Sequence, residues 1–313
     1  MSSEVRHKSV EANGIRMHVA EAGEGFPVVF CHGFPELWYS WRHQLQALSE
    51  AGFRAIAPDM RGYGETQAPP DPEQYRMSVL VEDIRGLLDE LDIEKAAIVG
   101  HDWGGALIWR FGLAHPERAS KLVGLNTPYA PAGPVSPIEA MRQQFGHDRG
   151  FYWLYFQEPG VAEAELQADI WGNLSKIFHD ASRAQDLWTF ATVGGDGSGV
   201  LANVPRGTTF LDAEELGVYV RAFERTGFRG GLNWYRAMNL TWQEEKDRED
   251  WTIRVPAMMV TAEKDMILRP DMAEPMRQWI PDLRIEHIKD CAHWTQQEKP
   301  DEVNRLLLDF LRG

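Results

Sequence analysis

Hydrophobic residues in the first 125 positions occur in short continuous runs separated by amphipathic stretches. Continuous runs of this length are typical of strands that are buried on both faces of a sheet. They lie at 27–31, 53–58, 96–99 and 121–125. The stretches between them place apolar residues three and four positions apart, which predicts helices. This alternation predicts an α/β fold with a mainly parallel, doubly wound sheet and right-handed crossovers.

Turn and capping residues refine this pattern. Residues 8–22 predict a hairpin, because Asn13-Gly14 separates two alternating runs. A helix is expected over about 41–51. Ser78 is expected to cap the next helix, since serine is a favoured N-cap residue. The apolar residues of that helix fall at helical spacing: Leu80, Ile84, Leu87, Leu88 and Leu91.

The alternation of strands and helices stops at about residue 129. From 129 to 250 the chain shows no clear strand, and amphipathic helical stretches rich in aromatic residues dominate. One of them starts at Asp212, which forms a capping-box pattern with Glu215. A glycine-rich loop at 193–199 interrupts the segment and is expected to be mobile. We therefore predict that 129–250 is a helical cap.

The sheet pattern resumes after this insertion. Residues 256–260 and 284–288 predict two further strands, with a helix near 271–279 between them. A last helix carries Val303, Leu306, Leu307, Phe310 and Leu311 on one face. The predicted core therefore consists of residues 1–128 and 251–313.

The composition argues against one kind of partner, a nucleic acid. The chain has 313 residues, of which 43% are hydrophobic and 25% charged, as expected of a globular protein with one large domain. Its 47 acidic side chains outnumber its 32 basic ones, which gives a formal net charge of −15, and no basic tract is visible. A nucleic-acid partner is therefore not expected.

The apolar segments that export and membrane insertion require are not visible either. The first residues hold no apolar core of the signal-peptide type, and no stretch approaches about eighteen apolar residues, so no membrane span is expected. Cys31 and Cys291 lack metal-ligand spacing around them. We expect reduced thiols in a cytoplasmic protein, and neither a metal nor an organic cofactor is implied.

The candidate chemistry centres on Asp102, which lies between a predicted strand and a predicted helix. Small residues stand two positions before it and two positions after it, at Gly100 and Gly104. This spacing is typical of a nucleophile elbow, a strained turn that lifts one side chain above the end of a sheet. In an esterase that residue is serine, whereas a carboxylate can attack a carbon directly. The alternative is that Asp102 only caps the helix that opens at Trp103.

A nucleophile elbow predicts an acid and then a histidine later in the chain. Asp265 follows the first strand after the insertion, and His293 follows the second. Both lie at the edge where open α/β sheets place their sites. Asp265 is expected to orient His293, which would activate water. Glu263 competes with Asp265 as the acid, and Asp290 is a weaker candidate.

A second loop is expected to face Asp102. His32-Gly33-Phe34-Pro35 follows the strand that should lie beside the elbow strand. The backbone N–H of Phe34 can then point at the same oxygen as the N–H of Trp103. Two such donors form an oxyanion hole, each worth about 3–4 kcal/mol of transition-state stabilisation. An ordinary tight turn is the alternative.

Several short motifs are distributed over most of the chain. They are His32-Gly33-Phe34-Pro35-Glu36, Gly100-His101-Asp102-Trp103-Gly104-Gly105, Phe156-Gln157-Glu158-Pro159-Gly160-Val161, Asn233-Trp234-Tyr235-Arg236 and His293-Trp294-Thr295-Gln296. Together they closely resemble the soluble epoxide hydrolases of the α/β-hydrolase superfamily, over about residues 9–312. The resemblance is closest to the hydrolase domain of the two-domain vertebrate enzymes, and the phosphatase activity of those enzymes is not expected here.

The resemblance implies that two tyrosines of the cap hold the oxygen of an epoxide. The matching positions are Tyr152, four residues before Phe156, and Tyr235 in the second cap motif. Tyr155 lies close to the first position and competes for this assignment. Without the resemblance, each tyrosine would be interpreted as a packed aromatic residue with a satisfied hydroxyl.

Together these residues predict an epoxide hydrolase that converts a small lipophilic epoxide and water into a vicinal diol. Asp102 would attack an epoxide carbon and form an ester, while Tyr152 and Tyr235 protonate the leaving oxygen. His293, oriented by Asp265, would then activate the water that hydrolyses the ester. The sequence leaves a homodimer open.

Other functions are compatible with the same fold. A haloalkane or haloacid dehalogenase would share Asp102 and His293, but cap tyrosines do not replace its halide-binding groups. A non-catalytic ligand receptor would typically lack one catalytic member, and here all of them are present. An esterase is disfavoured because the elbow lacks serine.

Overall fold

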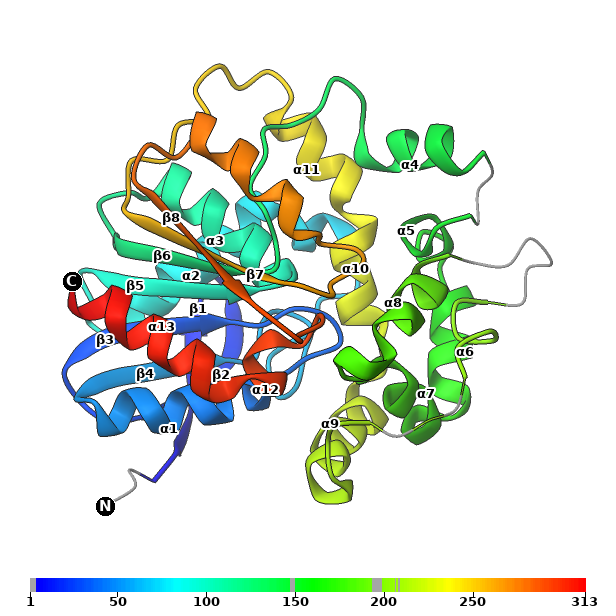
Figure 1. Ribbon diagram of the computed structural model, residues 1–313, viewed down its shortest axis with the longest axis horizontal. Helices are drawn as coiled ribbons and strands as arrows, with labels where there is room; N and C mark the ends of the chain where they lie inside the picture. The colour runs from blue at the N-terminus through cyan, green and yellow to red at the C-terminus, as the bar shows by residue number, and fades with distance from the viewer. Residues whose placement is uncertain (1–3, 147–149, 193–198, 206, 208) are drawn as a thin grey trace.

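The computed structural model describes residues 4–146, 150–192, 199–205, 207 and 209–313. Its strands are β1 (Arg6–Ala12), β2 (Ile15–Ala22), β3 (Phe26–Cys31), β4 (Phe53–Pro58), β5 (Ala96–His101), β6 (Ala119–Leu125), β7 (Ala257–Ala262) and β8 (Leu283–Ile288). They form one sheet in the described residues, with the order β1-β2-β4-β3-β5-β6-β7-β8. The β1–β2 and β2–β4 pairs are antiparallel and all others are parallel, so the mainly parallel sheet is confirmed (Figure 1).

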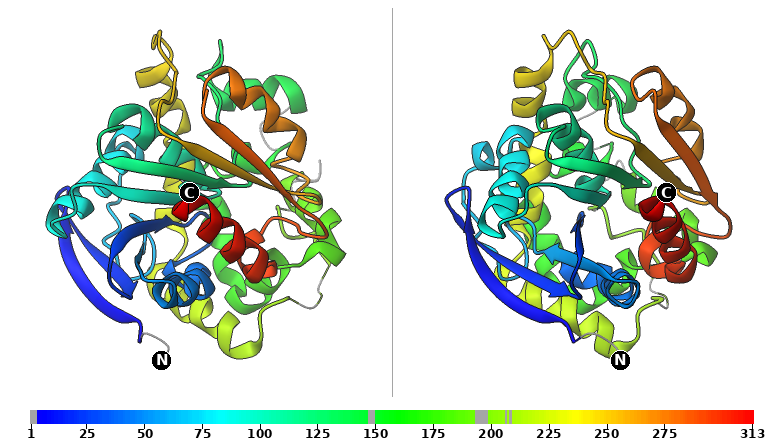
Figure 2. Two further views of the ribbon diagram at one scale, coloured as in Figure 1. Left: turned by 60° about the vertical axis from the view of Figure 1, so that its left-hand side comes forward. Right: turned by 90° about the vertical axis from the view of Figure 1, so that its left-hand side faces the viewer.

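Helices cover both faces of this sheet. Within β5, Ile98 packs into the core shared with α2 (Met77–Glu90) and α3 (Trp103–Ala114), whereas Val99 packs on the opposite face. That face is covered by α1 (Arg42–Glu50) and α13 (Pro300–Arg312), which lie beside each other in Figure 2. All residues of β5 are buried as a result, which explains the continuous apolar run in the sequence.

The predicted hairpin is present at the edge of the sheet. Ala12 pairs with Ile15, so the turn consists of Asn13 and Gly14. Their φ angles are 46° and 75°, the left-handed values that a two-residue hairpin turn requires. The Asn13 side chain also donates to Asp83 Oδ1 at 2.8 Å, which ties the hairpin to α2.

Ser78 does not cap α2 as predicted. The helix begins at Met77, two residues earlier than a cap at Ser78 implies, and Arg76 is its N-cap. The Ser78 hydroxyl instead donates to Glu244 Oε2 at 2.7 Å, on a helix of the insertion. The hydroxyl that the local sequence predicts at the helix N-terminus therefore forms a tertiary hydrogen bond instead.

The helix expected near 271–279 is also different. The segment forms two short 3-10 helices, η4 (Pro270–Met272) and η5 (Glu274–Gln278). Pro275 would lie in the interior of a continuous α-helix, where it removes a hydrogen-bond donor and collides with the preceding turn. The other short helices are η1 (Trp38–Trp41), η2 (Pro72–Tyr75), η3 (Ala181–Arg183) and α12 (Thr295–Glu298).

The insertion between β6 and β7 is helical and contains no strand in its described residues. Its helices are α4 (Pro137–Phe145), α5 (Tyr152–Tyr155), α6 (Val161–Ala168), α7 (Ile170–Ile177), α8 (Ala184–Ala191), α9 (Ala213–Thr226), α10 (Arg229–Arg236) and α11 (Met238–Glu245). The predicted capping box opens α9, where Asp212 and Glu215 bond each other's backbone N–H groups. Residues 193–198 of the predicted glycine-rich loop lie outside the described residues. Figure 1 shows most of these helices beside the end of the sheet toward which β5 points.

Both cysteines of the chain lie in the described residues. Cys31 and Cys291 are free, buried thiols, and burial raises the pKa of both. A buried thiol with a raised pKa is a poor nucleophile, so we expect both side chains to pack rather than react. None of the described helices is long and apolar enough to cross a bilayer.

Candidate active site

Asp102 lies in the turn between β5 and α3, where its backbone has the strained angles φ 53° and ψ −120°. The two predicted small residues make this turn sterically feasible. A Cβ atom on Gly100 would lie 2.2 Å from Gly104 O, and one on Gly104 would lie 2.0 Å from Cys31 O. Any larger residue at either position would therefore push the turn away from β3 and α3.

The Asp102 side chain does not act as a simple helix cap. Although Asp102 is the N-cap residue of α3, its side chain makes no capping hydrogen bond. The carboxylate instead accepts a hydrogen bond from Phe34 N–H, with Oδ1 at 2.8 Å. Burial raises the pKa of Asp102, while His293 and the N–H groups of Phe34 and Trp103 favour the charged form.

The loop after β3 approaches Asp102 closely, because β3 is the parallel neighbour of β5. A Cβ atom on Gly33 would lie 2.2 Å from Asp102 Oδ1, so only glycine leaves room for the carboxylate. The Phe34–Pro35 peptide bond is cis. The N–H groups of Phe34 and Trp103 thus both face the Asp102 carboxyl group, where charge would develop if its carbonyl carbon were attacked.

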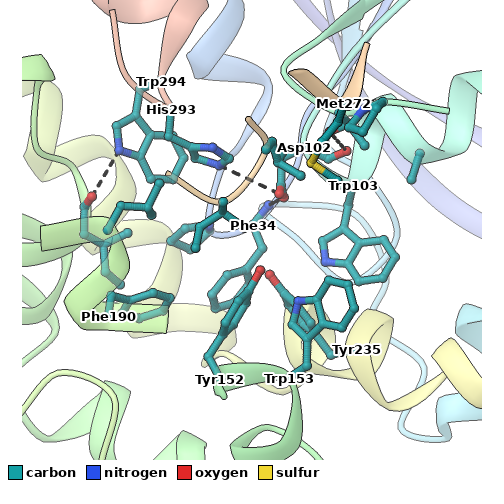
Figure 3. A pocket seen from close by; sticks show the side chains of 18 of the residues that line it. Phe34, Asp102, Trp103, Tyr152, Trp153, Phe190, Tyr235, Met272, His293 and Trp294 are labelled. Atoms are coloured by element: carbon teal, nitrogen blue, oxygen red, sulfur yellow. Dashed lines mark hydrogen bonds and ion pairs between the residues drawn. The ribbon is translucent and has the colours of Figure 1, made fainter. Parts of the chain in front are cut away.

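His293 lies between two carboxylates. Its Nδ1 atom is 2.8 Å from Asp265 Oδ2. Its Nε2 atom is 3.8 Å from Asp102 Oδ2, and Figure 3 marks this pair. Asp265 and His293 are both buried. Three residues that are far apart in sequence therefore meet in the order expected for a nucleophile, a base and an orienting acid.

The two competing acids lie elsewhere. Glu263 Oε2 accepts from Asp290 N at 2.9 Å, and Asp290 pairs with Lys264 on the surface. In the described part of the chain, neither carboxylate forms a hydrogen bond or ion pair with His293. The geometry therefore favours Asp265.

Charge coupling distinguishes the two members of the His293–Asp265 pair. Burial alone would raise the pKa of Asp265, but His293 and several N–H donors outweigh it and lower this pKa to about 2. Burial alone would lower the pKa of His293, but Asp265 and then Asp102 outweigh it and raise this pKa to about 9. With Asp102 ionised, His293 is therefore cationic at neutral pH.

This coupling predicts how His293 titrates when Asp265 loses its charge. Asp265→Asn should move the pKa of His293 to a value below about 9, because burial then opposes protonation with one carboxylate fewer. The His293 cation formed during water activation would also lose support, so kcat should fall by about 10²-fold. Nitrogen NMR titration of the His293 ring measures the first effect. Glu263→Gln is the matched control, and an equal shift in that variant would contradict the assignment of Asp265.

A pair of residues that the sequence did not single out supports this arrangement from the end of β6. Asn126 donates to Asp265 Oδ2 at 2.8 Å, and its Oδ1 accepts from Thr295 at 2.7 Å. The next residue, Thr127, donates to Asp102 O at 2.7 Å. Their position directly after a buried central strand was the available signal, but their partners lie in α12 and in the turns after β5 and β7.

His101 and Glu36 form a second buried support. His101 Nε2 donates to His293 O at 2.7 Å, and Nδ1 is 2.7 Å from Glu36 Oε2. Glu36 also accepts from Gly33 N at 3.0 Å. Burial would raise the pKa of Glu36, but His101 outweighs it and lowers this pKa to about 2. The pair thus links the His293 loop to the loop of Phe34.

Tyr152 on α5 and Tyr235 on α10 face Asp102 from the insertion. Their ring centroids are 5.7 Å apart, and Figure 3 shows both hydroxyl ends directed toward Asp102. Burial raises the pKa of both hydroxyls well above the ordinary value, with the Asp102 carboxylate adding to the effect. Tyr155, by contrast, is not among the described residues that line the cavity above Asp102.

The cavity has a volume of about 320 Å³. Asp102, His293, Tyr152 and Tyr235 contribute polar atoms to its wall. Most of the remaining side chains are apolar, including Trp153, Ile177, Leu187, Phe190, Met238, Ile267, Leu268 and Met272. A concave, mainly apolar site with a few converging polar groups is typical of small-molecule binding.

Comparison with known proteins connects this geometry to a family. Residues 27–300 match the family model described as the alpha/beta hydrolase fold. The chain is 41% identical to epoxide hydrolase A of Mycobacterium tuberculosis over 314 residues, which cover 97% of this chain and 96% of that protein. The chain belongs to the epoxide hydrolase family.

Other members of the epoxide hydrolase family are similar over nearly the whole chain. The bifunctional epoxide hydrolase 2 of Sus scrofa is 46% identical over 304 residues, or 95% of this chain. The chain matches only 53% of the length of that relative. The crystal structure of epoxide hydrolase A from Mycobacterium thermoresistibile matches with a TM-score of 0.93 at 42% identity and covers 99% of both chains. The epoxide hydrolase VrEH1 from Vigna radiata matches with a TM-score of 0.89 at 35% identity, covering 99% of this chain and 98% of that one.

Proposed function

We propose that this protein hydrolyses a lipophilic epoxide to a vicinal diol through an ester of Asp102. The observation that carries this proposal is the placement of the Tyr152 and Tyr235 hydroxyls opposite the half-buried Asp102 carboxylate in one cavity. Opening an epoxide needs a nucleophile on carbon and a proton for the departing oxygen, and these groups supply both. The names of the similar proteins support the same reaction.

In the first half of the reaction, Asp102 attacks one ring carbon. A carbon–oxygen bond of the ring breaks, and its electron pair moves to the oxygen, which takes a proton from a tyrosine. The raised pKa of Tyr152 and Tyr235 keeps both hydroxyls protonated at neutral pH, so that they act as donors to this oxygen. The product is an ester between Asp102 and the alcohol.

In the second half, His293 takes a proton from water, and the resulting hydroxide attacks the carbonyl carbon of the ester. Ester formation removes the negative charge of Asp102, one of the groups that raise the pKa of His293 to about 9. The pKa of His293 therefore falls at this stage, which favours the neutral ring that can accept a proton from water. The negative charge on the ester carbonyl oxygen develops toward the N–H groups of Phe34 and Trp103, which form an oxyanion hole.

The ester bond to the alcohol oxygen then breaks, Asp102 becomes a carboxylate again and the diol leaves. Of the two protons of the consumed water, one ends on the departing alcohol oxygen, and the other replaces, by way of His293, the proton that the tyrosine gave up.

The two tyrosines should have large and separate effects. Tyr152→Phe and Tyr235→Phe should each lower the rate of ester formation by about 10²-fold, because each removes a donor to the departing oxygen. The rate of ester hydrolysis should change much less. Rapid-quench measurements under single-turnover conditions separate the two rates. Tyr155→Phe is the matched control, and a larger loss there than in Tyr152→Phe would reverse the assignment of the first tyrosine.

A dehalogenase is the rival with the same nucleophile and base. We expect the protein to hydrolyse a styrene-type or fatty-acid epoxide and to leave a chloroalkane of similar size intact. A departing halide needs no proton, whereas the two tyrosine hydroxyls are placed to protonate a departing oxygen. A paired assay with diol detection and halide release measures both activities. Chloride release without diol formation would replace this proposal by the dehalogenase.

The candidate residues come from two parts of the chain. We propose that residues 129–250 act as a cap over a core of 1–128 and 251–313, since the tyrosines come from the insertion and the nucleophile, base and acid from the sheet domain. A cytoplasmic location and a homodimer stay predictions of the sequence. Size-exclusion chromatography with light scattering tests the latter.

A further inference from the structure

Glu298 carries a half-buried carboxylate that the proposed reaction does not use. It is the last residue of α12, which directly follows the loop of His293. Its side chain turns back toward that loop, where Oε2 accepts from Ala292 N at 3.2 Å and Oε1 accepts from Trp294 N at 2.9 Å. Ala292 and Trp294 are the two chain neighbours of His293. One carboxylate thus holds backbone N–H groups on both sides of the proposed base.

Other elements hold the carbonyl groups of the same loop. His101 Nε2 donates to His293 O at 2.7 Å, and Asn126 donates to Ala292 O at 3.3 Å. The sheet domain thus binds carbonyl oxygens of the loop, whereas Glu298 binds its N–H groups. The rotamers open to a side chain depend on the backbone angles of its residue. A loop that is fixed at both neighbours of His293 therefore also limits the direction of the ring.

The surroundings of Glu298 favour a carboxylate with two accepting oxygens. Burial raises the pKa of Glu298 to about 7, although the N–H groups of Ala292, Trp294 and Ala181 and the charge of His293 favour the ionised form. Ala181 belongs to η3 of the insertion, so the carboxylate faces the cap as well as the base. An ionised carboxylate can accept from several donors at once, whereas an amide offers only one oxygen.

We propose that Glu298 is a positioning residue that holds His293 in the orientation required for hydrolysis of the Asp102 ester. This inference rests on the proposed function, because it assigns a further residue to the second half of that reaction. Glu298 acts through the backbone beside His293 and is not among the described residues that line the cavity. The first half uses Asp102 and the tyrosines, so it should be almost independent of Glu298.

The kinetic test is Glu298→Gln, which keeps the size of the side chain but leaves one accepting oxygen for the two N–H groups. Above pH of about 7, where Glu298 is ionised, the rate of ester hydrolysis should fall by about tenfold. The rate of ester formation should change by less than about twofold. Rapid-quench measurements of a single turnover give both rates. Glu302→Gln, the same change at an exposed position on α13, is the matched control and should alter neither rate.

A second measurement uses the unaltered protein without substrate. The amide protons of Ala292 and Trp294 should shift together with one common midpoint as Glu298 titrates, because both donate to the same carboxylate. The ring resonances of His293 should show an inflection at that same pH, since the loop and the nearby charge change together. Proton and nitrogen NMR titration records all three signals, and the result does not depend on the folding of a variant.

The outcomes separate this inference from the proposed function. Ester hydrolysis by Glu298→Gln within about twofold of the unaltered rate would overturn the inference. An equal loss in both half-reactions would also overturn it, because it would show a general role in the fold. Amide protons that titrate at different pH values, or not at all, would contradict the shared carboxylate. Failure of the unaltered protein to form a diol from any epoxide would instead overturn the proposed function and leave the NMR result intact.

Discussion

Asp102→Ala should lower kcat by at least about 10⁴-fold, because it removes the atom that bonds to substrate. The substitution leaves Gly100 and Gly104 in place, and the Asp102 side chain makes no capping hydrogen bond to α3. The fold should therefore survive, although a positive φ at residue 102 disfavours any residue with a Cβ atom. Circular dichroism and thermal unfolding check this point separately from activity.

Oxygen labelling tests the same nucleophile in the unaltered protein. A single turnover in heavy-oxygen water should return unlabelled diol, because the oxygen delivered to the epoxide carbon comes from Asp102. The label should appear in the Asp102 carboxylate, where peptide mass spectrometry can locate it. Full labelling of the diol in the first turnover would rule out the ester, and residual activity of Asp102→Ala within tenfold of normal would do the same.

His293→Gln should stop the reaction half-way. Ester formation needs only Asp102 and the tyrosines, whereas ester hydrolysis needs the base. The variant should therefore accumulate a covalent adduct while steady-state turnover falls by about 10³-fold or more. The adduct should increase the mass of the protein by the mass of the intact epoxide, which mass spectrometry of the whole chain detects.

The control for this experiment is His287→Gln, at an exposed position on β8. It should turn over substrate normally and show no adduct in the steady state. A double variant, His293→Gln with Asp102→Ala, should lose the adduct. Loss of turnover without any adduct in His293→Gln would mean that His293 is already needed for ester formation, which contradicts the proposed order of steps.

The pattern of the sequence by itself determined the sheet, the elbow and the chain order of the candidate residues. These features depend on local physics: continuous apolar runs belong to strands with two buried faces, and a strained turn tolerates only small neighbours. A Cβ atom at Gly100 or Gly104 would collide with neighbouring backbone atoms, which shows this steric limit directly. Local patterning failed at Ser78, where a contact with Glu244 replaced the expected cap.

Only the tertiary structure distinguished between chemically equivalent neighbours. Asp265 and Glu263 are two residues apart on one loop, yet only Asp265 points at His293, while Glu263 bonds the backbone of Asp290. Tyr152 and Tyr155 are likewise one helical turn apart, and of the two Tyr152 lines the cavity. Side-chain direction within a loop or helix depends on packing against distant elements, which a single sequence does not encode locally.

The buried supports were hidden from the sequence for the same reason. Asn126 donates a hydrogen bond to Asp265, which lies 139 positions later in the chain, and His101 donates one to the backbone oxygen of His293, which lies 192 positions later. Their hydrogen bonds join loops and strand ends that meet only at the carboxyl edge of the folded sheet. The sequence by itself thus determined which kinds of groups the carboxyl edge of the sheet presents, through turn sterics and strand order. The fold decided which of them meet, because hydrogen bonding requires an approach to about 3 Å and distant strands must first pack together.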